Sequence, residues 1–323
     1  MVNDAKLTEA DYFAGHGAAL GFPDPPLHVQ KNYEFNMRSA QSSVQAGSLM
    51  TELVQHLSSL AETYAGDRPN LLYYPAKPSD LSVLIKPFQS VLTKIYRVNY
   101  LHNQKFPDEP DQSGFVRYDA IYDHPKMNDL LRARLVCKYM DGPQVVVQGL
   151  QAFCQDRDLE FRSYPMNSDM GYYAWHCYMR IPLEIMIYDS VENKKIWFEL
   201  QVTTQLAEVI TGLTHGLYEG QRVRSSRATA NEWRWRPKSQ QFRSAYLGHT
   251  LHLLEGVIQT FRDEVLGLEV DSGGEIPIEH QETLTLPPDA RGSAGPGAPF
   301  SSSERTVRKT PDGSDGGSSG EAT

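Results

Sequence analysis

Residues 194–204, KKIWFELQVTT, decide the fold because apolar and polar side chains alternate along them with a period of two. Successive side chains of a β-strand point to opposite faces of the sheet, so this pattern predicts a strand with one apolar face. The apolar face carries Ile196, Phe198, Leu200 and Val202. The other face carries a carboxylate and an amide two residues apart, Glu199 and Gln201. This second face is therefore where we expect chemistry.

The preceding segment, AWHCYMRIPLEI, alternates in the same way and predicts a second strand with a polar face. That face carries His176, Tyr178 and Arg180. Further strands are expected in LSVLIK, in LLRARLV and near residues 160–164. Helices are expected near residues 49–64, 87–100, 143–157, 204–219 and 240–266. This order predicts an α/β (α+β) domain in which helices flank a mixed β-sheet.

Composition restricts the environment of the protein and divides the chain. Of its 323 residues 40% are hydrophobic, and no apolar run approaches the roughly 18 residues of a membrane-spanning helix. The amino terminus has early acidic residues and no apolar stretch typical of a secretory signal, so we expect a cytoplasmic protein without a membrane partner. Residues 1–70 are expected to form a helical region, 71–270 the main domain with a carboxyl-terminal helix, and 271–323 a disordered tail rich in Gly, Ser and Pro.

Positive charge is concentrated in residues 221–243 although the net charge is −9. The overall negative charge argues against unspecific attraction to nucleic acid. The segment nevertheless interleaves its basic residues with Trp233 and Trp235, as platforms for single-stranded nucleic acid do. A solvated basic loop in front of a helix is the alternative interpretation, and both remain open.

Asp129 lies where a polar loop enters the LLRARLV strand, and from there its carboxylate can reach a cation at the edge of a neighbouring strand. It could share a magnesium ion with Glu199. Magnesium takes hard oxygen ligands and commonly needs only one or two protein carboxylates beside ligand phosphates. Lys86 lies at a junction of strand and helix, with Ser90 and Lys94 one helical turn apart after it. The unpaired N–H groups of that helix start also favour phosphate.

The order of segments from about residue 80 to residue 220 resembles the synthetase domain of the RelA/SpoT family, in the manner of a small alarmone synthetase. The family's phosphate-binding segment appears as LIKPFQSVLTK, with Leu84 in place of an arginine. Its D-x-x-G-x-R segment appears as DLLRAR, where Arg132 replaces a small residue. The segments GYYAWH, ELQVTT and THGLYE match the family at residues Tyr172, His176, Glu199, Gln201, His215 and Tyr218.

The resemblance implies a nucleotidyltransferase-like synthetase fold and transfer of the β,γ-pyrophosphate of ATP to the 3′-hydroxyl of GDP or GTP. It implies Glu199 and Gln201 as catalytic residues, and Asp129 and Glu199 as ligands of Mg²⁺. The nucleotide-binding residues that it implies are Lys86, Ser90, Lys94, Arg134, Tyr172, His176 and His215. The paired His-Asp site of the family's hydrolase half is missing, so we expect a synthetase alone.

Three departures from the family pattern leave the acceptor open. Leu84, Thr203 and the absence of a lysine after Pro165 each remove a positive charge, for which Arg162 or Arg180 could compensate. One alternative is the same chemistry on the 3′ end of tRNA or on an adenosine nucleotide. Another is a catalytically silent nucleotide-binding module, although two retained carboxylates argue against it. The resemblance also leaves room for a homo-oligomer.

Overall fold

The computed structural model describes residues 7–22, 26–65, 71–75, 77–167, 169, 171–187, 190–213 and 232–268. The expected nucleotide-binding residue His215 lies outside these ranges, as do Tyr218, the tail from residue 271 and residues 221–231 of the basic region.

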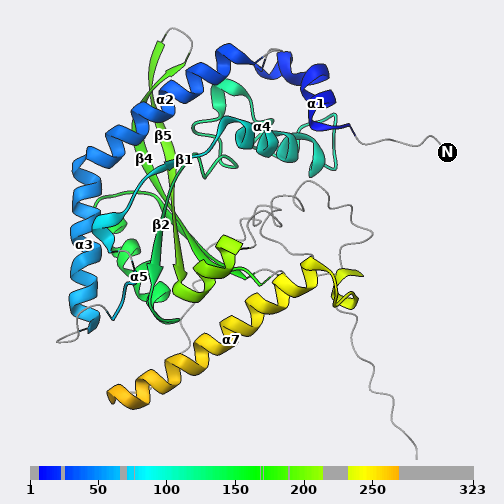
Figure 1. Cartoon of the computed structure of the whole chain (residues 1–323). Coiled ribbons are helices and arrows are strands. Elements are labelled where there is room, and N and C mark those ends of the chain that lie inside the picture. The colour runs from blue at the N-terminus through cyan, green and yellow to red at the C-terminus, as the bar shows by residue number, and fades with distance from the viewer. Residues whose placement is uncertain are drawn as a thin grey trace, which may run out of the picture. The chain divides into compact units, whose positions relative to one another are not determined.

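A five-stranded sheet in the order β1-β2-β5-β4-β3 forms the centre of the protein (Figure 1). Its strands are β1 Leu84–Ile85, β2 Leu131–Cys137, β3 Phe161–Asn167, β4 Tyr173–Ile187 and β5 Ser190–Thr204. β2 and β5 pair in parallel, and the other neighbours are antiparallel. The mixed sheet expected from the sequence is therefore confirmed.

Helices precede the sheet, connect its strands and follow it. The α-helices are α1 Glu9–Tyr12, α2 Leu27–Ala46, α3 Ser48–Ala65, α4 Phe88–Tyr96, α5 Gly142–Gln155 and α7 Gln240–Leu266, and residues 205–213 are also helical. Short 3₁₀ turns cover Ala18–Leu20, Pro78–Asp80, Tyr118–Ala120 and Glu232–Trp235, and π-helical turns cover Phe13–Gly17 and Arg97–Leu101. The helix expected to reach residue 100 thus changes to a π-helical turn at Arg97, where Asn99 turns inward to bond the backbone of Val116.

The apolar face of the sheet packs under α2, α3 and α5 (Figure 1). The four apolar residues expected on one face of β5 are all buried in this core, which confirms the alternation. Met37 of α2 and Leu57 of α3 are fully buried in the same cluster. The two sides of the boundary expected near residue 70 therefore share one core.

The long helix α7 is joined to the sheet through a glycine pair. A Cβ on Gly248 would lie 2.2 Å from the carbonyl oxygen of Gly171, which has a φ of +75°. Next to this contact the ring of Tyr173 stacks on His252, with centroids 3.6 Å apart. The same helix exposes apolar side chains, including Leu253, Val257, Phe261 and Val265. The homo-oligomer considered from the sequence stays a prediction. None of the described helices is long and apolar enough to cross a membrane.

Candidate active site

Strand register gathers the polar side chains of three strands on the face opposite the core. In the antiparallel pair of β4 and β5, Tyr178 lies opposite Glu199 and His176 opposite Gln201. In the parallel pair of β2 and β5, Arg132 is the partner of Glu199. Partners in a register share a face. The polar faces expected from the two alternating segments therefore form one continuous surface.

Glu199 lies at the centre of this surface and is only 3% exposed. Its Oε1 lies 2.8 Å from Nδ1 of His176 and accepts a hydrogen bond of 3.2 Å from the hydroxyl of Tyr178. Its Oε2 accepts a hydrogen bond of 3.0 Å from the amide of Gln201. Burial, the largest influence, acts to raise the pKa of Glu199, but the hydrogen bond and charge of His176, together with the charge of Lys94, hold this pKa below its ordinary value. The carboxylate is thus ionised and fixed in orientation.

Asp129 forms a second buried centre with two lysines. Its Oδ2 lies 2.7 Å from Nζ of Lys86 and its Oδ1 lies 2.8 Å from Nζ of Lys94, which also donates to Asn128. The two lysines are 6% and 7% exposed. Burial disfavours the charged carboxylate, yet the nearby charges of Lys94 and Lys86 hold the pKa of Asp129 well below its usual range. Asp129 thus contacts both Lys86 and Lys94, the side chains expected beside the metal and the donor phosphates. Ser90 lies on α4 four residues before Lys94 and is half-buried.

The two centres lie within electrostatic range of each other. The charge of Asp129 raises the pKa of Glu199, and the charge of Lys94 lowers it. Each carboxylate oxygen of Asp129 and Glu199 already has a protein partner, but a carboxylate oxygen has further lone-pair capacity. Within the described ranges, no group of three or more His, Cys, Asp or Glu residues is arranged so that it could hold a metal ion by itself. Asp129 and Glu199 offer carboxylate oxygens, the hard ligands that Mg²⁺ prefers, and Mg²⁺ commonly completes its coordination with phosphate oxygens and water.

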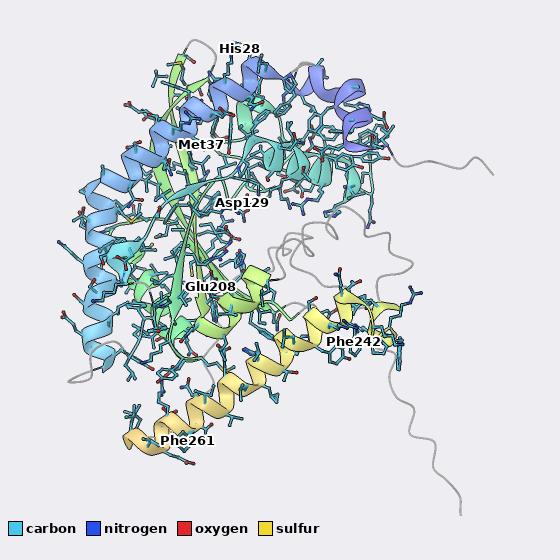
Figure 2. All side chains as sticks on the ribbon, in the orientation of Figure 1. His28, Met37, Asp129, Glu208, Phe242 and Phe261 are labelled. Carbon is cyan, nitrogen blue, oxygen red and sulfur yellow. The ribbon has the colours of Figure 1, made fainter. Side chains whose placement is uncertain are left out.

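Arg134, expected to bind phosphate, is held by a residue that the sequence did not reveal. Its Nη1 donates to both carboxylate oxygens of Glu208 at 2.8 and 2.9 Å, and its Nη2 donates to Gln201 at 3.3 Å. Glu208 belongs to the helix of residues 205–213, and Figure 2 labels it together with Asp129. Since 74 residues separate the two partners, no local pattern signals this ion pair.

The acceptor side of the expected site contains Tyr172 and His176. The Tyr172 hydroxyl lies 2.9 Å from Nε2 of His176, and the two rings meet edge to face. His176 therefore connects Tyr172 to Glu199 through its two ring nitrogens. Tyr178 also contacts this pair, and its period-two spacing from His176 was the sequence signal for it.

Arg162 and Arg180, the two candidates for compensating charge, lie together on the sheet. Both guanidinium groups lie over the ring of Trp197, and both bind Glu160, Arg180 with a hydrogen bond of 3.0 Å. Of the basic region, Arg234 pairs with Asp169 and Trp233 is buried. Trp235 is 87% exposed.

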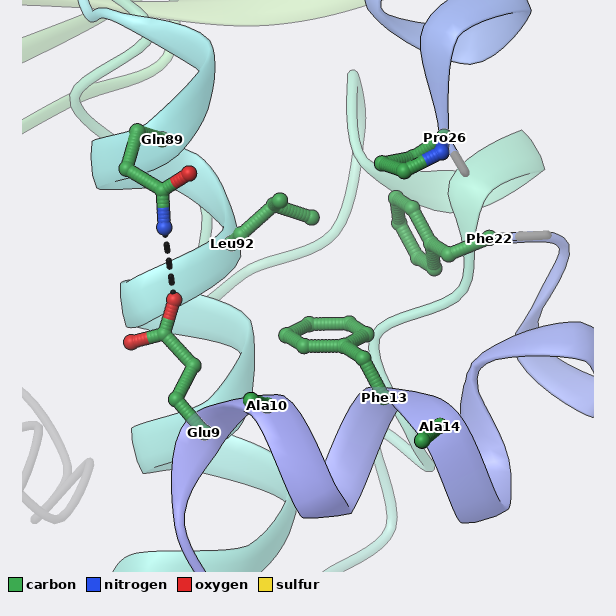
Figure 3. A pocket seen from close by; sticks show the side chains of 8 residues that line it. All are labelled: Glu9, Ala10, Phe13, Ala14, Phe22, Pro26, Gln89 and Leu92. Atoms are coloured by element: carbon green, nitrogen blue, oxygen red, sulfur yellow. Dashed lines mark hydrogen bonds between the residues drawn. The ribbon is translucent and has the colours of Figure 1, made fainter. Parts of the chain in front are cut away.

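An apolar pocket lies apart from these centres, between α1 and α4 (Figure 3). It is lined by Phe13, Phe22 and Leu92, and a hydrogen bond of 2.8 Å from Gln89 to Glu9 crosses its rim. None of the site residues expected from the sequence lines it.

Neither a protein-family model nor a curated protein matches the sequence. Solved structures do. The chain is similar in structure to small alarmone synthetases. Small alarmone synthetase 1 from Bacillus subtilis aligns at 16% identity and a TM-score of 0.43 over 73% of this chain and 97% of its own. The same enzyme bound to its product pppGpp aligns at 17% identity and a TM-score of 0.40, over 68% of this chain and 92% of its own.

A GTP pyrophosphokinase family protein from Streptococcus pneumoniae aligns at 13% identity and a TM-score of 0.37, over 68% of this chain and 91% of its own. Similarity at this level assigns no reaction, which has to come from the side chains of the site.

Proposed function

We propose that the protein is a magnesium-dependent nucleotide pyrophosphokinase that transfers the β,γ-pyrophosphate of ATP to the 3′-hydroxyl of GDP or GTP. The observation that carries this proposal is a buried, ionised Glu199 within electrostatic range of Asp129 and its two buried lysines. An ionised carboxylate that is held in one orientation can accept a proton, and lysines beside a second carboxylate suit a polyphosphate with its cation. The order of motifs in the sequence supports the same reaction.

In this reaction Glu199 orients the acceptor's 3′-hydroxyl and receives its proton. The 3′-oxygen forms a bond to the β-phosphorus, the bond from the β-phosphorus to the α,β-bridging oxygen breaks, and AMP leaves. His176, Tyr178 and Gln201 hold the carboxylate in one orientation, so little reorganisation is needed. Asp129 and Glu199 would hold a magnesium ion, which would supply neutralisation of phosphate charge. Catalysis of phosphoryl transfer depends mainly on such positioning and charge.

The donor phosphates would contact Lys86, Ser90, Lys94 and Arg134. Lys86, Lys94 and Arg134 each already pair with a carboxylate. The donor phosphates must therefore bind these cations beside that carboxylate or displace it. Arg134 is the simplest case, because its guanidinium would exchange Glu208 for a phosphate, and both present two oxygens to its planar fork. On the acceptor side, Tyr172 would stack on the base and His176 would line the site, with His215 as a further expected contact.

The test is a transfer assay with γ-labelled ATP and magnesium, in which GDP, GTP, ADP and bulk tRNA are offered separately. We expect label on GDP or GTP, and we expect Glu199→Gln to lower the rate about 10²–10⁴-fold because general-base catalysis contributes that much. Chelation of magnesium should abolish transfer in both proteins. The matched control is Glu184→Gln, an exposed carboxylate on β4 outside the site.

The acceptor decides between the alternatives. If label appeared only on tRNA or only on ADP, that molecule and not a guanosine nucleotide would be the acceptor, and the proposed pyrophosphate transfer would still stand. No Glu199-dependent transfer to any acceptor would reject the enzyme and leave a nucleotide-binding module.

A further inference from the structure

Arg132 differs from the other cations of the site in its lack of a counter-charge. Lys86 and Lys94 are neutralised by Asp129, and Arg134 is bound by Glu208 through two oxygens. Within the described ranges, Arg132 forms no ion pair and no side-chain hydrogen bond, although it is half-buried. Since removing a charged group from water without a partner is unfavourable, this guanidinium is poised to bind an anion.

The register places Arg132 at the centre of the site. It is the parallel partner of Glu199 on β5 and the antiparallel partner of Leu84 on β1. It also lies close to Lys86, because Lys86 directly follows β1 and its backbone N–H donates to the carbonyl oxygen of Leu130 at 2.9 Å, at the start of the strand that carries Arg132. An anion that reaches Arg132 therefore also reaches the Asp129 and lysine centre.

The chemistry of this neighbourhood suits a phosphate-bearing anion. The planar guanidinium presents two parallel N–H groups that match a phosphate, and it stays charged at any physiological pH. On the outer strand β1, Leu84 is the register partner of Arg132 and is 53% exposed, so solvent reaches this part of the sheet. Leu84 supplies no charge of its own there, so Arg132 alone presents an unneutralised cation at this edge among the residues that the structure describes.

We propose that Arg132 binds the polyphosphate of the donor nucleotide, from β2 and across the strand from Leu84. The proposal rests on the proposed function for the identity of the donor, but the predicted contact is a binding event and can be measured without turnover. Arg132 would then be the first cation of the site to bind the donor, because a phosphate can reach it without displacing a protein carboxylate.

The experiment measures binding of magnesium and α,β-methylene ATP by calorimetry, alongside the transfer assay. We expect Arg132→Gln to weaken binding and to raise KM for ATP about 10–100-fold, because hydrogen bonds between charged groups are among the strong ones. The matched control is Arg117→Gln, which removes an exposed arginine paired with Asp119. Directly opposed residues of an antiparallel pair have Cβ atoms about 5 Å apart, so Leu84→Arg in the Arg132→Gln protein should restore part of the affinity.

The outcomes separate this inference from the proposed function. Unchanged affinity and KM in a folded Arg132→Gln protein that still transfers pyrophosphate would overturn the inference and leave the function standing. If binding of the analogue depended on Arg132 but the protein transferred pyrophosphate to no acceptor, the inference would stand and the proposed function would be overturned. A wild-type protein that binds neither the analogue nor ATP would overturn both.

Discussion

Glu199 stays ionised in a buried position because His176 contacts it, and this makes the pH dependence of the site predictable. Burial, the largest influence, acts to raise the pKa of Glu199, and His176 provides the main opposing influence. A base with a lowered folded-state pKa is active above that pKa and loses activity as the pH falls through it. His176→Leu removes the main influence that lowers the pKa of Glu199, so this pKa should rise. The acid limb of kcat/KM should then move to higher pH.

The measurement is the pH profile of kcat/KM for His176→Leu and for wild type. His28→Gln is the control, since His28 is exposed on α2 and is not among the residues of the site. A lower rate with an unmoved acid limb would show that His176 contacts the acceptor without setting the charge of Glu199.

At the scale of elements, the contact between α7 and the start of β4 depends on glycine. An alanine at Gly248 would bring its Cβ to 2.2 Å from the backbone of Gly171, so the helix must move away. Overpacking of this kind typically costs about 1–3 kcal/mol. We expect Gly248→Ala to lower the free energy of unfolding by about this amount and to disrupt the stacking of Tyr173 on His252.

Gly256 of the same helix provides a matched control. A Cβ there meets only the Sδ of Met140, at 3.9 Å. Since alanine is the better helix former by about 1 kcal/mol, Gly256→Ala should stabilise the protein slightly. Equal effects of the two substitutions in denaturant unfolding would mean that α7 does not pack on Gly171 in solution.

The elements also show how far the sequence leads. Period-two alternation predicted which side chains share a face within β4 and within β5, but the contact of His176 with Glu199 depends on the pairing and register of the two strands, which the alternation does not give. The parallel pairing of β2 with β5 depends on tertiary packing and has no local signal. The ion pair of Arg134 with Glu208 also depends on tertiary packing. A local pattern can suggest that an arginine binds phosphate, but it cannot identify the distant carboxylate that pairs with that arginine.

At the scale of the whole molecule, α2 connects distant parts of the chain through Asn36, which is 2% exposed. Its Nδ2 lies 2.7 Å from the carbonyl oxygen of Met186 and 2.9 Å from the hydroxyl of Tyr122, and its Oδ1 accepts from the backbone N–H of Met186 at 3.1 Å. In Asn36→Leu these buried groups lose their partner. We expect the free energy of unfolding to fall by about 1–3 kcal/mol, the cost of an unsatisfied buried group.

A shared core further predicts that the helices before residue 70 and the sheet unfold together. Urea unfolding followed by far-UV circular dichroism, which reports helices, and by tryptophan fluorescence, which includes Trp197 of β5, should give coincident transitions. Asn36→Leu should shift both transitions equally, whereas Ser39→Ala on the exposed side of α2 should shift neither by more than about 0.5 kcal/mol. If Asn36→Leu moved only the dichroism transition, α2 and α3 would form an independent unit. Their contacts with the segment that carries Lys86, such as the bond from Tyr33 to its carbonyl oxygen, would then contribute little to the stability of the sheet.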